Sequence, residues 1–66
     1  MRISVEQFER EFNALIDAAL SASNRETARR YLIQAENKIY GYDNIPRNLQ
    51  NEYLRRIERA KEQLDL

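Results

Sequence analysis

Residues 38–47 have the sequence Lys-Ile-Tyr-Gly-Tyr-Asp-Asn-Ile-Pro-Arg, which contains the only glycine and the only proline of this 66-residue chain. Glycine often follows the end of a helix in the left-handed conformation, and proline fits the first turn of a helix. The stretch therefore predicts one helix that ends at about Tyr40, with Gly41 as the left-handed residue after it. It also predicts a further helix that begins at about Ile45.

A second break lies upstream at residues 21–24, a polar run in which Ser23 and Asn24 are alternative helix caps. Elsewhere, apolar residues recur three and four positions apart, the period of an amphipathic helix. We therefore predict helices at about residues 5–20, 25–40 and 45–64. Short connections make neighbouring helices antiparallel, so the expected fold is an all-α, up-down-up three-helix bundle in a single domain, residues 1–66. The apolar stripes that should form its core are Val5, Phe8, Phe12, Leu15 and Ala19; Ala28, Leu32, Ala35 and Ile39; and Leu49, Tyr53, Ile57, Ala60 and Leu64.

The composition argues against several classes of function. Eleven lysines and arginines balance eleven aspartates and glutamates, and histidine and cysteine are absent. Without these two residue types the chain has no imidazole base, no thiolate nucleophile and no structural zinc site. We therefore expect no enzyme activity, no cofactor and no bound metal. No apolar run approaches the ~18 residues of a membrane span, and the N-terminus does not resemble a secretory signal, so a cytoplasmic protein is expected.

Three apolar residues point well away from the core stripes. On a helical projection Ile33 and Tyr40 point ~120–140° away from the stripe of the second helix, with Arg29 and Glu36 beside them. Leu54 lies ~100° from the stripe of the third helix. These residues either sit at the edges of helix–helix contacts or form a shallow docking surface for a partner helix or peptide.

The stretch before the third helix also has two interpretations. Tyr42 and Ile45 are too apolar for a simple polar connection, so they either fold back to cap the bundle or contact a partner. We favour the cap for Ile45, beside Pro46, and the partner for Tyr40.

Arginine pairs raise a different hypothesis. Arg25 and Arg29 share one face of the second predicted helix, and Arg55 and Arg59 share one face of the third. Such stripes could contact phosphates, although the zero net charge and the glutamates of the third helix weaken a nucleic-acid footprint.

The third predicted helix resembles the last helix of MIT domains, the microtubule-interacting and trafficking modules. The resemblance rests on Glu52-Tyr53-Leu54-x-Arg56-x-Glu58-x-x-Lys61-Glu62-x-Leu64, and more weakly on Asn24-Arg25-Glu26-Thr27-Ala28 with Leu32 and Ala35. It implies a three-helix bundle that binds short peptide motifs in grooves against the third helix, with Leu54 as a groove residue. Arg55 and Arg59 stand where the family often offers acidic side chains to basic peptides, so an acidic partner is implied here.

Taken together, these features predict a non-catalytic protein-binding module, a small adaptor, regulator or inhibitor that docks on a larger protein. Its expected partner is another protein or a peptide motif, with no membrane contact. A nucleic-acid-associated helical protein is the alternative, and a homodimer in which the off-stripe residues complete a larger core is a third option. The predicted partner-binding residues are Arg29, Ile33, Tyr40, Tyr42, Leu54, Arg55 and Lys61.

Overall fold

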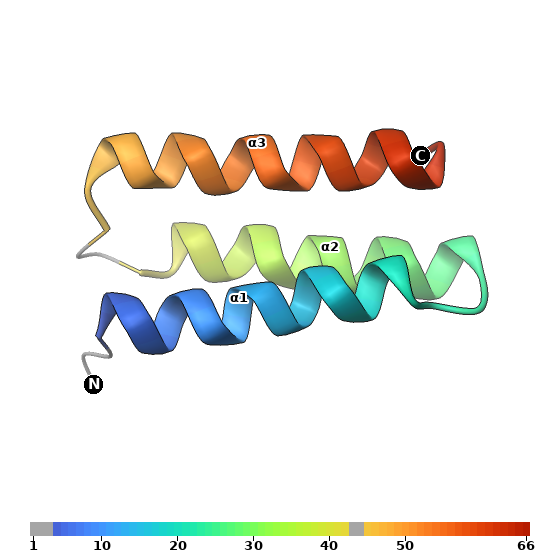
Figure 1. The fold of residues 1–66 in the computed structure, drawn as a ribbon, viewed down its shortest axis with the longest axis horizontal. Coiled ribbons are helices and arrows are strands. Elements are labelled where there is room, and N and C mark those ends of the chain that lie inside the picture. The colour runs from blue at the N-terminus through green and yellow to red at the C-terminus, as the bar shows by residue number, and fades with distance from the viewer. Residues whose placement is uncertain (1–3, 43–44) are drawn as a thin grey trace.

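The computed structural model describes residues 4–42 and 45–66, and all three regular elements within them are helices. They are α1 (Val5–Leu20), α2 (Arg25–Tyr40) and α3 (Arg47–Leu64). Figure 1 shows three rods side by side, whose chain direction reverses from each helix to the next. The predicted all-α, up-down-up three-helix bundle is therefore confirmed. The bounds of α1 and α2 agree with the predicted ranges.

Side-chain caps define the start of the first two helices. The Ser4 hydroxyl accepts a hydrogen bond from the Gln7 backbone N–H at 3.0 Å. The side-chain oxygen of Asn24 accepts one from the Thr27 N–H at 2.8 Å. Because the first turn of a helix leaves backbone N–H groups unpaired, each cap satisfies one of them. Of the two candidate caps before α2, the structure therefore uses Asn24 and not Ser23.

The start of α3 corrects the prediction by two residues. The helix begins at Arg47 and not at Ile45. Pro46 is its N-cap, with φ −58° and ψ 143°, and its carbonyl accepts the first helical hydrogen bond from the Gln50 N–H at 3.0 Å. The ring of a proline disfavours helical backbone in the residue before it, so Ile45 lies outside the helix.

Gly41 follows α2 as predicted, but its backbone is right-handed and not left-handed, with φ −84° and ψ −3°. Its N–H donates to the Asn37 carbonyl at 2.9 Å, which extends the helical hydrogen-bonding pattern by one residue. A Cβ at this position would lie 3.3 Å from the same carbonyl oxygen, tighter than most real contacts. Glycine therefore fits here because of a close backbone approach and not because of a positive φ.

The core has two parts. The first, which we call the aromatic cluster, contains the rings of Phe8, Phe12 and Tyr53, with centroids 4.9 to 5.9 Å apart. The second, which we call the alanine cluster, consists of Ala19, Leu32 and Ala60. Every buried hydrophobic residue in the described chain belongs to one of the predicted stripes. The aromatic cluster is completed by Ala35, Ile39 and Ile57.

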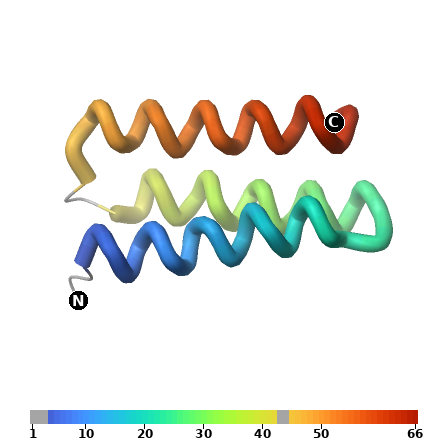
Figure 2. The backbone as a smooth tube through the Cα atoms, viewed as in Figure 1, coloured from blue at the N-terminus to red at the C-terminus, as the bar shows by residue number. Residues whose placement is uncertain are grey.

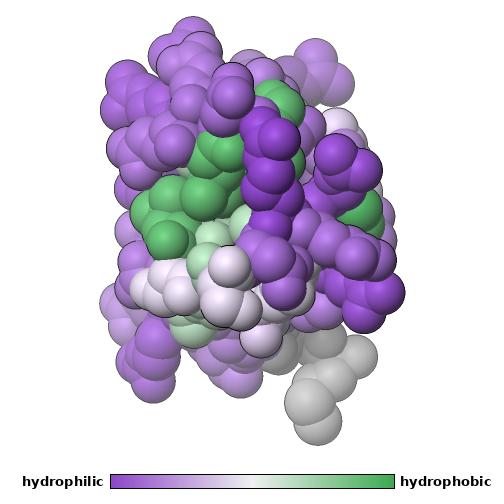
Figure 3. All heavy atoms as spheres, turned by 90° about the vertical axis from the view of Figure 1, so that its right-hand side faces the viewer, coloured by the Kyte–Doolittle hydropathy of each residue, from purple (hydrophilic) through white to green (hydrophobic). Residues whose placement is uncertain are grey.

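The two clusters occupy opposite ends of the bundle. Figure 2 places the start of α1 at one end, and the C-terminus at the other end with the α1–α2 connection. The alanine cluster belongs to the second end, because Ala19 lies in the last turn of α1 and Ala60 in the second half of α3. Figure 3 looks onto this end and shows a hydrophobic patch bordered by hydrophilic side chains. Two partly exposed leucines, Leu20 and Leu66, belong to this end.

Candidate functional site

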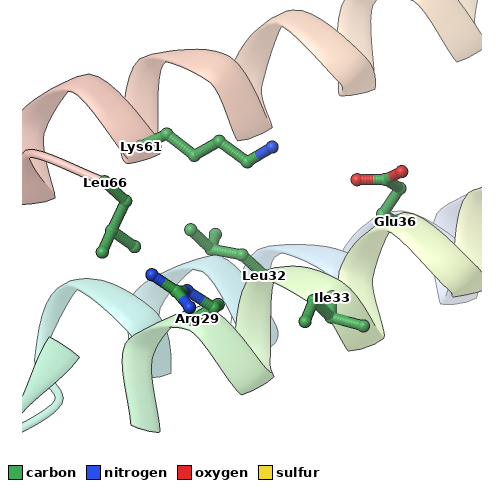
Figure 4. A pocket seen from close by; sticks show the side chains of 6 residues that line it. All are labelled: Arg29, Leu32, Ile33, Glu36, Lys61 and Leu66. Atoms are coloured by element: carbon green, nitrogen blue, oxygen red, sulfur yellow. The ribbon is translucent and has the colours of Figure 1, made fainter. Parts of the chain in front are cut away.

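A groove of about 320 Å³ lies between α2 and α3, and we call it the α2/α3 groove. Figure 4 shows side chains from both helices facing it, with Leu32 between the two ribbons and Ile33 farther out on α2. Its lining combines apolar side chains with both signs of charge. The lining residues are Arg29, Leu32, Ile33, Glu36, Lys61 and Leu66.

The packing beneath the groove explains why it exists. Leu32 is only 2% exposed and packs in the alanine cluster against Ala60 of α3. Because alanine has a single methyl group, the seam between α2 and α3 contains little side-chain volume at this level. Ile33, one position further along α2, points about 100° around the helix and is 50% exposed. The groove therefore has a buried apolar floor and an exposed apolar rim.

Leu66 closes one end of the groove through the way α3 terminates. Asp65 has a left-handed backbone, with φ 57° and ψ 46°, and it reverses the chain direction after α3. The Leu66 N–H then donates to the Lys61 carbonyl at 2.9 Å, and the Asp65 N–H donates to the Glu62 carbonyl at 3.2 Å. This is the Schellman arrangement, which typically brings the residue after the turn into apolar contact with its own helix.

An ion pair to α2 supports this turn. The Arg25 guanidinium donates to the Asp65 carbonyl and lies 3.3 Å from a carboxylate oxygen of Asp65. Both side chains are largely exposed, so the pair contributes little energy by itself. It nevertheless links the start of α2 to the end of α3, beside the groove.

The charged residues of the groove are only partly paired. Arg29 and Glu36 make no ion pair within the described residues, and Lys61 pairs with Glu58 on its own helix at 3.8 Å. In Figure 4 the Lys61 side chain extends along α3 towards Glu36, while Arg29 lies below Leu66 at the other end. The groove therefore has an arginine at one end and a glutamate at the other, with apolar side chains between them.

Three of the predicted partner-binding residues, Arg29, Ile33 and Lys61, meet in this groove. Tyr40 lies two turns beyond Ile33 on the same line of α2 and is 60% exposed, as the helical projection indicated. Leu54 lies two turns before Lys61 on α3, but it is half-buried and packs against the aromatic cluster. The structure thus places Leu54 at the edge of a helix–helix contact.

Two other predicted residues lie outside the groove. Tyr42 packs on the aromatic cluster, with its ring centroid 5.0 Å from that of Phe8, and Ile45 packs there as well. Both positions agree with the capping alternative. Arg55 is exposed on α3 and has no ion pair within residues 4–42 and 45–66.

Sequence reasoning missed Leu66 and treated Leu32 only as core. The sequence signal for Leu66 was weak: just beyond the end of the third stripe, an apolar residue follows a polar one. Its place in the groove lining, however, depends on the left-handed turn at Asp65. A stripe analysis treats each helix alone and cannot place a residue that lies beyond the helix end.

Two groups outside the groove have perturbed acidity. Hydrogen bonds, first from Lys38 and then from Gln7, lower the pKa of Glu11 below 4.5. Burial raises the pKa of the Tyr53 hydroxyl above 10.0. Tyr53 belongs to the aromatic cluster, and Glu11 pairs with Lys38 at the border of that cluster. These shifts therefore concern stability more than chemistry at the groove.

The arginine stripes of the nucleic-acid hypothesis are partly neutralised. Arg25 is held by Asp65, and Arg56, which flanks the Arg55 and Arg59 stripe, lies 3.8 Å from Glu9 and 3.6 Å from Glu52. Arg29, Arg55 and Arg59 remain without ion pairs among the residues that the structure describes. This hypothesis stays an alternative.

Metal-ligating clusters and membrane-spanning helices are both missing from the described ranges. These ranges contain no group of three or more acidic, histidine or cysteine side chains that could hold a metal ion. None of the helices found there combines the length and the apolar character required to cross a membrane. Comparison with protein-family models, curated proteins and solved structures finds no match.

Proposed function

We propose that this protein is a non-catalytic protein-binding module that docks on a larger protein through the α2/α3 groove, as an adaptor, regulator or inhibitor in the cytoplasm. The observation that carries the proposal is the half-exposed Ile33 beside a buried Leu32 floor, bordered by charged side chains that have few internal partners. Isolated apolar residues on a surface are common. Here the exposed isoleucine borders a groove, which is the arrangement that receives a side chain from a partner.

The residue content supports a binding role over a catalytic one. The chain contains no histidine and no cysteine. Glu58 and Glu62 form a carboxylate pair on a single helix face, but both are exposed and outside the groove lining. General acid–base catalysis requires such groups beside a bound substrate in a pocket.

The chemistry of the groove defines the expected partner segment. An amphipathic segment with a large apolar side chain would fit between Ile33 and Leu66, above Leu32. A carboxylate on the same segment would pair with Arg29, which has no ion pair in the described part of the chain. The inference of an acidic partner from the MIT resemblance agrees with this chemistry.

The test begins with a photo-crosslinking amino acid at position 33, with Ala14 on the exposed side of α1 as the matched control position. A larger protein that crosslinks only from position 33 is then purified, and its affinity for the wild type is measured. We expect Ile33→Asp to weaken this affinity at least about tenfold, the size of effect at a central interface residue. Arg10→Glu, on α1, should leave it unchanged. Equal affinities of wild type and Ile33→Asp would contradict docking through the groove.

A further inference from the structure

Along the rim of the α2/α3 groove, α2 presents an arginine, an isoleucine and a glutamate in that order. Arg29 and Glu36 are seven positions apart, which is about two helical turns or about 10.5 Å, and Ile33 lies between them. The two charges are opposite, and neither has an ion pair within the described part of the chain. When two copies of this row of side chains lie antiparallel, the arginine of each copy therefore faces the glutamate of the other.

Two copies of the chain related by a two-fold axis would bring these opposite charges together. If the axis passes between positions 32 and 33 of α2, an antiparallel second α2 places its Glu36 opposite Arg29. The same operation places its Arg29 opposite Glu36, so both pairs form at once. Ile33 then packs beside Ile33 of the second copy, above the buried Leu32. A two-fold interface requires this kind of self-complementary patch.

We propose that two copies of this chain associate through the α2/α3 groove as an antiparallel pair, with Ile33 near the two-fold axis and Arg29 paired with Glu36 of the second copy. The inference rests on the proposed function in one respect: self-association covers the surface that docks on the larger protein. A second copy and the larger protein therefore compete for the groove. The monomer is the binding-competent form.

The size of the face limits the strength of this association. Six of the described residues line the groove, whereas a stable protein interface usually takes in ~20–30 residues of each partner. Stable protein interfaces bury ~800 Å² on each partner. The pair should therefore be weak and dependent on concentration, so that a partner with a larger interface displaces the second copy.

Sedimentation equilibrium of the pure protein, from low micromolar to millimolar concentration, measures the association. We expect a monomer–dimer equilibrium in this range for the wild type. Arg29→Glu alone and Glu36→Arg alone should each weaken it at least about tenfold, because each reversal turns two attractive pairs into two repulsive ones. Arg10→Glu, which reverses an exposed arginine on α1, should associate as the wild type does.

The decisive measurement mixes the two single variants, Arg29→Glu and Glu36→Arg, in equal amounts. In the mixed pair the two substituted positions face each other with opposite charges, and the unchanged Arg29 of one chain faces the unchanged Glu36 of the other. Complementarity is therefore restored at both contacts, and the mixture should associate at least about tenfold more tightly than either variant alone. This rescue also shows that both variants are folded, which circular dichroism checks directly.

Two results would overturn the proposal: a wild type that stays monomeric at millimolar concentration, or a mixture that associates no better than its components. Neither result would contradict docking on a larger protein, because that function is tested separately by the effect of Ile33→Asp on partner affinity. Conversely, a dimer that forms as described while Ile33→Asp leaves partner affinity intact would contradict only the proposed function.

Discussion

The ammonium nitrogen of Lys38 lies 2.5 Å from a carboxylate oxygen of Glu11, and this ion pair joins α2 to α1. The same nitrogen lies 6.0 Å from the centroid of the Phe8 ring, at the border of the aromatic cluster. The lysine side chain is 24% exposed, so water screens this pair less than the other ion pairs of the surface. It is therefore the ion pair whose effect on stability should be easiest to measure.

We expect this pair to make stability depend on acid pH. Because the hydrogen bond from Lys38 lowers the pKa of Glu11, the carboxylate stabilises the fold at neutral pH, above its ordinary value of 4.5. This contribution is lost as pH falls through the lower pKa of the folded state. Urea unfolding from neutral pH to about pH 3 measures the slope, which Lys38→Met should flatten. Arg30→Met, which removes only the exposed pair with Glu26, should leave the slope as it is.

Tyr42 and Tyr40 provide a matched comparison of a packed and an exposed tyrosine. Tyr42→Ser removes a ring that packs on Phe8 at 5.0 Å and should lower the free energy of unfolding by about 1–2 kcal/mol. In a domain this small the melting temperature should fall by at least about 4 °C. Tyr40→Ser should change stability by less than about 0.5 kcal/mol, because that side chain is 60% exposed. Equal losses would mean that Tyr42 does not cap the bundle.

The cap of α2 can be tested at two adjacent polar residues. Asn24→Ala removes the acceptor for the Thr27 N–H and should lower stability by about 1 kcal/mol in thermal unfolding. Ser23→Ala should have almost no effect, because Asn24 is the capping residue. If the two substitutions had equal effects, the cap would not be specific to Asn24.

At alkaline pH the buried Tyr53 should limit stability. Its raised pKa means that the neutral hydroxyl stabilises the fold fully below the unfolded-state value of 10.0. That contribution is lost as pH rises through the folded-state pKa. Tyr53→Phe should flatten the decline of unfolding free energy above about pH 10, and Tyr40→Phe should not. Tyrosinate absorbance during a pH titration should show a late phase from the Tyr53 hydroxyl, and this phase should be missing in Tyr53→Phe.

The helical period predicts which residues are buried because each helix turns one stripe of side chains towards the common core. Phe8, Leu32 and Ile57 come from three different helices, and all three are buried as the period indicates. The predicted start of α3 is two residues too early because a proline within the first helical turn and one at the N-cap give the same local pattern. The handedness of Gly41 is equally ambiguous in the sequence, since glycine suits both a left-handed turn and a close backbone approach.

The groove could be predicted only in part. The projection identifies Ile33 and Arg29 as facing outward, because their direction depends only on α2. The contributions of Lys61 and Leu66 depend on how closely α3 approaches α2 and on the turn at Asp65. Leu54 is the converse case. Its angle on the helical projection places it off the core stripe, but that angle alone does not distinguish a residue that lines a groove from one that packs against the flank of a neighbouring helix.

The division of the core into two clusters has a consequence for how the molecule fluctuates. Alanine side chains bury much less apolar area than aromatic rings, so the end that contains Ala19 and Ala60 is held by a smaller hydrophobic contribution. Local opening, seen as amide hydrogen exchange, should therefore be faster there than around Phe8 and Tyr53. The α2/α3 groove stands over this more labile half. A partner bound in the groove would stabilise this end and slow amide hydrogen exchange there more than around the aromatic cluster. Binding would therefore change how local stability is distributed along the bundle.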